Sequence, residues 1–186
     1  MKQKIELLAP ARDSATAMAA LEHGADAVYM GGPSLGARAA ATNSIDDIAR
    51  VADRAHRFGA KLYVTMNTII YDRELDDALR QAWDLYRALI VQDMALTAME
   101  GMPPIDLHAS TQCDIRDIAT ARRLAASGFS RIVVAREMDA TTIAKIKAEL
   151  PSTEIEAFVH GALCVCYSGD CRASLVTTGR SANRGE

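Results

Sequence analysis

Long hydrophobic runs are missing from this sequence. No segment approaches the roughly 20 apolar residues that cross a bilayer, and the stretch Met1–Pro10 becomes polar too soon for the core of a signal peptide. The sequence also lacks an excess of either charge, because 21 basic and 24 acidic residues leave a net charge of −3. This balance argues against broad electrostatic capture of nucleic acid. We therefore expect a cytoplasmic protein without a membrane association.

Low-complexity composition and the motifs of common hydrolases are absent as well. Apolar residues make up 49% and charged residues 24% of the 186 residues, which excludes disordered, collagen-like and coiled-coil chains. There is no HExxH, no GxSxG and no helix that pairs two histidines four residues apart. Cys164 or Cys166 could act as a nucleophile with His160 as its base. Residues so close along one strand and loop seldom reach the required orientation, so this alternative is weak.

Cysteines are few, but three of the four lie within eight residues: Cys113 stands alone, and Cys164, Cys166 and Cys171 form the group. In a reducing compartment such a group indicates metal binding or redox chemistry rather than a disulfide framework. The loop between Cys164 and Cys171 could bring both sulfurs to one metal centre, and thiolate-rich sites select iron–sulfur clusters or zinc. The alternative is that the cysteines are buried and structural, which we expect for Cys113.

Seven short β-rich segments recur along the chain at intervals of 16 to 34 residues, the spacing of βα units. They are Ile5–Ala9, Ala27–Met30, Lys61–Met66, Leu89–Gln92, Ile105–Ala109, Arg131–Ala135 and Ile155–Val159. Most are continuously apolar, as parallel strands covered on both faces should be. Right-handed crossovers then allow an open doubly wound sheet or an eight-stranded barrel. Because barrels need about 250 residues, we predict an incomplete TIM-barrel-like α/β domain of about seven βα units.

Helices between these strands are expected to begin at capping residues. The expected caps are Ser14, Ser44, Asp72, Asp114 and Asp139. The third of these helices runs into the strand near Ala88 without a glycine, so either the helix frays at its end or the strand starts late. We divide the chain into a barrel-like domain, 1–160, and a cysteine-containing loop and tail of the same domain, 161–186. No strand or helix is expected in the tail.

Ligands of either α/β architecture bind at the carboxyl ends of the strands. In this sequence those ends form a polar ring with three arginines, Arg12, Arg38 and Arg136, which suits an anionic or polar ligand such as a carboxylate or a nucleotide. Some of these side chains could instead be helix caps or partners in salt bridges. His23 and His56 are expected on exposed helix surfaces, and His108 is expected in the core.

The segment that follows the seventh strand carries a recognisable pattern. It reads Glu156-x-Phe158-x-x-Gly161-Ala162-Leu163-Cys164 and continues as Ser168-Gly169-x-Cys171-x-x-Ser174. Further motifs of the same kind cover nearly the whole chain: Leu7–Ala11, Gly24–Tyr29, Tyr63–Thr68, Val91–Asp93, His108–Gln112 and Arg136-Glu137. Together these motifs resemble those of peptidase family U32, whose older name is collagenase-like peptidases.

The resemblance implies a TIM-barrel-like catalytic domain with a [4Fe–4S] cluster near the end of the seventh strand. Some members hydroxylate tRNA or rRNA bases without oxygen, some hydroxylate a quinone ring, and others carry only the protease name. The resemblance implies that Cys164 and Cys171 are metal ligands but leaves out Cys166, where many members have alanine. The run 181–186 resembles the one that precedes the family's third cysteine ligand. Arg12 is a departure, because the family usually has glycine there.

We therefore predict an iron–sulfur-dependent enzyme, or a fragment of one, that hydroxylates tRNA or rRNA bases. The predicted cofactor is a [4Fe–4S] cluster, for which this chain carries two of the family ligands. The residues expected to orient the substrate are Arg38, Asn67, Gln92, Arg136, Glu137 and His160. The partner is expected to be RNA or a small anionic substrate, and exposed sheet edges would favour a homo-oligomer. A peptidase and a non-catalytic barrel that binds RNA or protein remain the alternatives.

Overall fold

A single parallel sheet organises the chain. The structure, a computed structural model, describes residues 5–37, 42–85, 88–162, 164, 166–170, 172–179 and 181–184. Its strands pair in chain order, and each pair is parallel. They are β1 (Leu8–Ala11), β2 (Ala27–Gly31), β3 (Lys61–Met66), β4 (Ala88–Val91), β5 (Leu107–Ala109), β6 (Arg131–Val133) and β7 (Glu154–Glu156). All seven predicted strands are confirmed, with ends shifted by a few residues.

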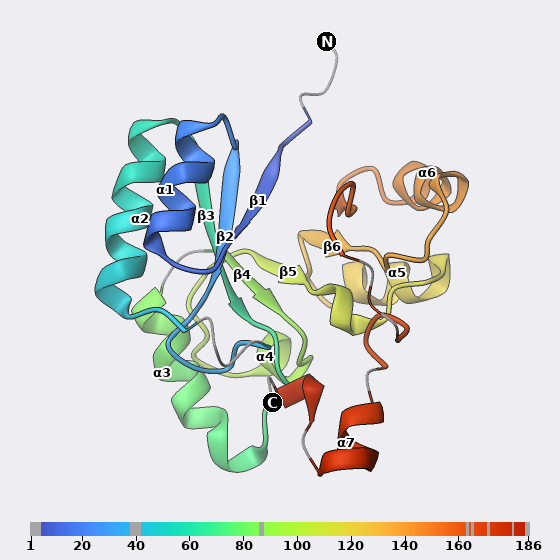
Figure 1. The fold of residues 1–186 in the computed structure, drawn as a ribbon. Coiled ribbons are helices and arrows are strands. Elements are labelled where there is room, and N and C mark those ends of the chain that lie inside the picture. The colour runs from blue at the N-terminus through green and yellow to red at the C-terminus, as the bar shows by residue number, and fades with distance from the viewer. Residues whose placement is uncertain are drawn as a thin grey trace.

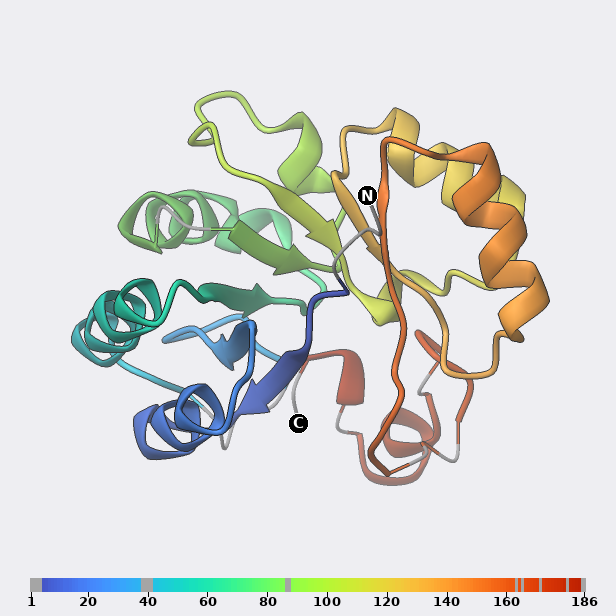
Figure 2. The same ribbon diagram turned by 90° about the horizontal axis from the view of Figure 1, so that it is seen from above.

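Helices cover the outer face of this sheet, which curls around its inner face (Figures 1 and 2). They are α1 (Ser14–Glu22), α2 (Ile45–Arg57), α3 (Leu75–Leu85), α4 (Ala95–Ala98), α5 (Ile118–Ala126), α6 (Ala140–Glu149) and α7 (Ala173–Thr178). Short 3₁₀ turns are η2 (Asp72–Glu74), η3 (Thr111–Cys113) and η4 (Ala182–Arg184). This arrangement is an incomplete TIM-barrel-like α/β fold, as predicted. In the part of the chain that the structure describes, no helix has the length and apolar character needed to span a membrane.

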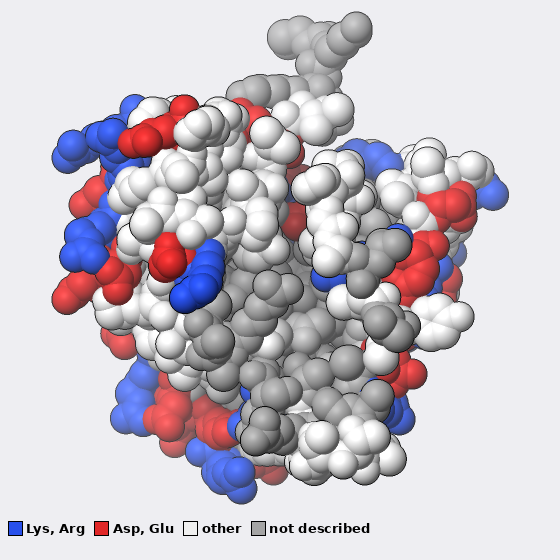
Figure 3. Space-filling model, viewed as in Figure 1, with Lys and Arg blue, Asp and Glu red and all other residues white. Residues whose placement is uncertain are grey.

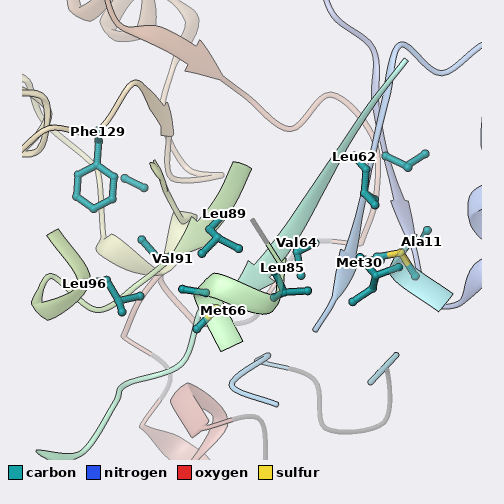
Figure 4. Close-up of a cluster of buried hydrophobic side chains, with 14 of the residues drawn as sticks. Ala11, Met30, Leu62, Val64, Met66, Leu85, Leu89, Val91, Leu96 and Phe129 are labelled. Atoms are coloured by element: carbon teal, nitrogen blue, oxygen red, sulfur yellow. The ribbon is translucent and has the colours of Figure 1, made fainter. Parts of the chain in front are cut away.

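Strand β3 shows how one sequence serves both faces of the sheet. Leu62, Val64 and Met66 belong to the large apolar core under the helices (Figure 4). Tyr63 instead lies on the inner face with Ile90 of β4. This alternation follows from the two-residue period of a strand. Val64 and Met66 are fully buried, and burial of each such side chain stabilises the fold by about 1.5–3 kcal/mol.

An ion network fills the inner face at the amino ends of the strands. Arg131 of β6, with only 7% of its side chain exposed, donates to Glu6, which precedes β1, at 2.7 Å. Its Nε donates to Glu154 of β7 at 2.7 Å, and Glu6 also accepts from Lys61 and Tyr63 of β3. The guanidinium carbon lies 4.9 Å from the centre of the Tyr63 ring. The network therefore ties β1 to β3 and β6 across the inside of the curled sheet.

Helix starts confirm part of the cap prediction and correct the rest. Ser44 forms a capping box with Asp47, and Asp139 caps α6. The prediction for Asp114 is wrong, because that residue adopts a left-handed conformation (φ 55°) and Asp117 caps α5 instead. Asp114 is therefore the end of the η3 turn and not the start of a helix.

Two further expectations also need correction. Asp13 caps α1, one residue before the expected Ser14, through a 2.9 Å hydrogen bond from the Thr16 backbone N–H. The tail is not without structure, since it contains α7 and η4. The six residues of α7 are too few to show a helical period in the sequence, and Gly179 (φ 72°) ends the helix. The junction near Ala88 is short, because α3 ends at Leu85 and β4 begins at Ala88.

Candidate functional site

A cavity of about 970 Å³ opens at the carboxyl ends of the strands. Its wall combines strand ends from opposite sides of the curled sheet with the segment that follows β7, and α7 lies at the same end of the fold (Figure 1). Among its lining residues are Arg12, Tyr29, Asn67, Gln112, Arg136, Phe158, Cys164 and Asn183. We call this space the carboxyl-end cavity. Its volume is at the upper end of the usual range for small-molecule sites, so it can hold a nucleotide.

The inner part of the carboxyl-end cavity is built from residues within the strands that point inward. Thr65, Ile90 and Val133 come from β3, β4 and β6, and Glu156 is the last residue of β7. Burial raises the pKa of Glu156 above its ordinary value, although Arg131 opposes this shift. The inner part of the cavity therefore combines apolar side chains with one half-buried carboxyl group.

The cysteine loop, by which we mean the described residues between Cys164 and Asp170, is fixed to the ends of β5 and β6. The Ser168 backbone N–H donates to Glu137 at 2.8 Å, its hydroxyl donates to the other carboxylate oxygen at 2.9 Å, and the Arg136 backbone N–H donates to that hydroxyl at 3.3 Å. Burial opposes ionisation of Glu137, yet the bonds from Ser168 leave its pKa below the ordinary value. Glu137 therefore anchors the loop and does not line the cavity.

Gly169 makes this docking possible. Its φ is +85°, and a Cβ at this position would lie 2.6 Å from the carbonyl oxygen of Gln112. Both the backbone conformation and the close approach require glycine. The cysteine loop can therefore pack tightly on η3 only with this residue.

The Arg136 side chain joins the loop to the end of β7. Its Nη1 lies 3.2 Å from Sγ of Cys164, and its guanidinium carbon lies 4.5 Å from the centre of the Phe158 ring. All three side chains line the carboxyl-end cavity. The guanidinium is thus held between a thiol and an aromatic face, where it can stabilise negative charge on the sulfur or on a ligand.

Three of the cysteines can be compared as metal ligands. Cys164 and Cys166 both line the carboxyl-end cavity, whereas burial raises the pKa of Cys113 to about 12 and its thiol donates toward the Gln92 carbonyl at 3.4 Å. Cys113 is therefore a protonated, structural thiol, in line with its expected role. The predicted ligand Cys171 lies outside the described residues.

The donors fit an iron–sulfur cluster in kind, because thiolate sulfur is the ligand that such clusters take. A [4Fe–4S] cluster generally requires four thiolates. Among the described residues no group of three or more potential metal ligands converges, so these residues supply part of a ligand set.

The remaining predicted substrate residues fall into different places. Asn67 lines the cavity, and its Oδ1 accepts from the Ala37 backbone N–H at 3.0 Å. The Gln92 amide reaches the Gln112 carbonyl at 3.5 Å, and Gln92 is not part of the cavity wall. His160 is exposed beyond β7, also outside the wall, and Arg38 lies outside the described residues. The structure thus brings Asn67, Arg136 and Cys164 together.

The segment after α7 returns across the molecule to the end of β3. Arg184 donates to both carboxylate oxygens of Glu74 at 2.7 and 2.8 Å, and its guanidinium carbon lies 4.5 Å from the centre of the Tyr71 ring. The hydrogen bonds from Arg184 lower the pKa of Glu74 to about 2. The Ile69 backbone N–H also donates to the carbonyl of Asn183 at 3.2 Å. These contacts place Asn183 in the cavity wall.

Sequence reasoning missed two kinds of site residue. Tyr29, Ile90 and Val133 line the cavity from positions within the strands, and only the two-residue alternation of inward-facing side chains could have identified them. Asn183 and Ser168 reach the site through the tertiary path of the tail; the family motifs mark both segments but do not say where in space they lie. Position along the chain could reveal only those site residues that directly follow a strand.

The fold and the site define a class of protein: a parallel β/α barrel in which thiols open onto a cavity at the carboxyl ends of the strands. A sequence model of peptidase family U32 matches residues 12–186. The chain belongs to this family, which confirms the resemblance seen in the sequence.

Two relatives and one solved structure give the comparison more detail. The chain is 54% identical to the 23S rRNA 5-hydroxycytidine C2501 synthase of Escherichia coli K12 over 98% of the chain and 28% of that protein. It is 37% identical to tRNA hydroxylation protein P1 of Bacillus subtilis 168 over 98% of the chain and 45% of that protein. The chain thus spans less than half the length of these relatives. The U32 peptidase Mk0906 shares the fold, with a TM-score of 0.69 and 13% identity over 84% of this chain and 69% of that one.

Proposed function

We propose that this chain is part of an enzyme that hydroxylates a base of ribosomal or transfer RNA. The observation that carries the proposal is the carboxyl-end cavity, which is large enough for a nucleotide and presents the thiol of Cys164 beside Arg136. The names of the two relatives support an RNA base as the substrate. We accordingly propose a cytoplasmic enzyme with RNA as its partner.

Access to the cavity requires the target nucleotide to leave its stack. A base inside a duplex or a folded RNA cannot enter a barrel end, so it must be extruded into the site. Charges of both signs are interspersed over the outer helices on the face shown in Figure 3, without a continuous basic area among the described residues of that face. Recognition at the cavity itself, rather than general attraction of the phosphate backbone, then contributes specificity.

The proposed cofactor is a [4Fe–4S] cluster held in part by Cys164 and Cys171. When bound, such a cluster supplies one-electron redox chemistry at the cavity wall. Arg136 would donate a hydrogen bond to the ligating sulfur, and Glu137 would hold the cysteine loop in place through Ser168. Cys166 lines the same wall and is the other described thiol there that could substitute for a missing ligand.

A peptidase has less support from the site. Cys164 contacts Arg136, while His160, the base that a cysteine nucleophile would need, is outside the cavity wall. Within the described residues the cavity therefore has no thiol–imidazole pair of the kind that cysteine peptidases use.

The test is to purify the full protein without oxygen and to measure iron, sulfide and its effect on RNA. Ribosomal and transfer RNA from a strain without the gene should lack one hydroxylated base, which mass spectrometry of nucleosides would detect and the intact gene would restore. An unchanged nucleoside profile would refute the proposal, and cleavage of casein by the pure protein would favour the peptidase instead. Cys164→Ala should lower the iron content, whereas Cys113→Ala should not.

A further inference from the structure

Glu156 is the one acidic side chain in the wall of the carboxyl-end cavity among the described residues. It is the last residue of β7, and only 19% of its side chain is exposed. Its Oε2 lies 3.4 Å from Nη1 of Arg131, so it also touches the ion network at the opposite end of the barrel. Glu154, two residues earlier on the same face of the strand, lines the amino-end pocket instead. Glu156 is therefore the member of the network that faces the candidate site.

The network neutralises Glu156 less completely than its neighbours. Arg131 donates at 2.7 Å to Glu6 and at 2.7 Å from Nε to Glu154, but its contact with Glu156 is 3.4 Å long. Lys61 donates at 2.8 Å to Glu6. Three carboxylates thus share two cations, which leaves one negative charge in excess if all are ionised.

The surroundings of Glu156 favour its neutral form. Its neighbours in the inner part of the cavity include the apolar side chains of Ile90 and Val133, and desolvation penalises a charged carboxylate. Burial accordingly raises the pKa of Glu156, while the pKa of Glu6 is lowered by its hydrogen bonds to Arg131 and Lys61 despite burial. Of the three carboxyl groups, the one that opens onto the cavity is thus the least compensated by the cations.

A neutral carboxyl group presents one O–H donor beside one carbonyl acceptor, whereas a carboxylate can only accept. The Watson–Crick edge of a pyrimidine presents the complementary pair: N3 and the N4 amino group in cytosine, or N3–H and O4 in uracil. Building on the proposed function, we propose that Glu156 is the residue that binds this edge of the substrate pyrimidine in the carboxyl-end cavity. The two hydrogen bonds would orient the ring while Phe158 and Arg136 bound the outer wall.

The experiment compares four variants of the full protein: Glu156→Gln, Glu156→Ala, Glu154→Gln and Glu154→Ala. Glutamine keeps one donor and one acceptor on a side chain of the same shape, so it imitates the neutral carboxyl group. Glu154 is the matched control because it contacts the same arginine from outside the cavity. Binding of cytidine and uridine 5′-monophosphate is measured by calorimetry, with inorganic phosphate as the control ligand, and thermal unfolding reports the fold of every variant.

We expect the Glu156→Gln protein to bind the nucleotide within about twofold of the wild-type Kd. The Glu156→Ala protein should bind on the order of 10- to 100-fold more weakly, as expected for the loss of a bidentate base contact. Both Glu154 variants should bind as the wild type does. The proposal is overturned if the wild type binds neither mononucleotide, if the alanine variant at Glu156 binds normally, or if the glutamine variant is folded and as weak as the alanine variant.

Nucleoside analysis of RNA from cells that carry each variant separates this proposal from the proposed function. If the wild-type gene restores the hydroxylated base and Glu156→Ala restores it equally well, RNA hydroxylation stands and the role of Glu156 is refuted. If no gene restores a hydroxylated base but nucleotide binding follows the side chain at Glu156, the binding role stands and the hydroxylation proposal fails.

Discussion

Replacement of Arg131 by methionine tests how the inside of the barrel is held together. Arg131 is buried and contacts three carboxylates, Glu6, Glu154 and Glu156, which come from β7 and from the segment before β1. Methionine fills much of the same space without charge, so the variant removes the central cation and leaves its three partners in place. The decrease in the free energy of unfolding is then electrostatic and does not come from a cavity left in the core.

The expected loss follows from the cost of leaving buried charge uncompensated. Removal of one partner from a buried ion pair costs about 3–5 kcal/mol, and the cation–π contact with Tyr63 adds about 0.5–1 kcal/mol. Part of this loss is relieved when the carboxylates bind protons. In the variant their pKa values in the folded state rise above those of the unfolded chain, so stability is lost as pH rises and regained as pH falls. We expect a loss of about 3–5 kcal/mol at pH 7 and a smaller one at pH 5.

The assay is urea unfolding followed by circular dichroism at both pH values. Arg122→Met is the matched control, because Arg122 pairs with Glu149 on the surface with 62% of its side chain exposed; this variant should lose less than about 1 kcal/mol. The reasoning is refuted if Arg131→Met costs no more than the control, or if its deficit grows on acidification.

Three further predictions concern single positions. Burial lowers the pKa of His108 to about 4, so the wild type should lose about 3 kcal/mol of stability as pH falls from about 6.5 to 4. In a plot of the urea midpoint against pH, His108→Phe should flatten this part of the curve. An unchanged slope would contradict the prediction. Gly169→Ala should detach the cysteine loop and speed its limited proteolysis. Gly161→Ala should have a smaller effect, because Gly161 shares the positive φ (134°) but a Cβ there meets nothing within 4 Å; equal rates would contradict the argument. Because Arg184 lowers the pKa of Glu74 to about 2, docking of the C-terminal segment should weaken as pH falls from about 4.5 to 2. Glu74→Gln should expose that segment to protease already at pH 7. Protease resistance equal to that of the wild type would contradict the role of this contact.

Much of the fold could be predicted because its signals are local. Most strands lie in short apolar runs, and Ser44 and Asp139 cap helices through their own neighbouring backbone N–H groups. The prediction for Asp114 failed because an aspartate serves equally as a helix cap and as a left-handed turn residue. Which role it takes depends on where η3 ends, and that is set by the packing of this turn beneath the cysteine loop.

The site was predictable only where position along the chain determines position in space. Strand ends meet at one end of a parallel barrel, so the order of the strands is enough to place Asn67 and Arg136 at the cavity. Glu137 shares that position, but its side chain turns to Ser168, a partner 31 residues away. The docking of the tail on Glu74 spans 110 residues and has no counterpart in local sequence.

Glu156 shows why stability and recognition are not separable in this barrel. A TIM-barrel interior is ordinarily filled by branched apolar side chains, with the chemistry confined to the carboxyl end. Here a chain of charged groups runs from Glu6 through Arg131 to Glu156, so the inner part of the cavity is in electrostatic contact with the amino end. A buried ion network contributes little net stability over apolar packing, which leaves its presence without a purely structural reason. The proposed contact of Glu156 with the substrate supplies one, since the cations that hold Glu6 and Glu154 leave Glu156 the least compensated of the three carboxyl groups.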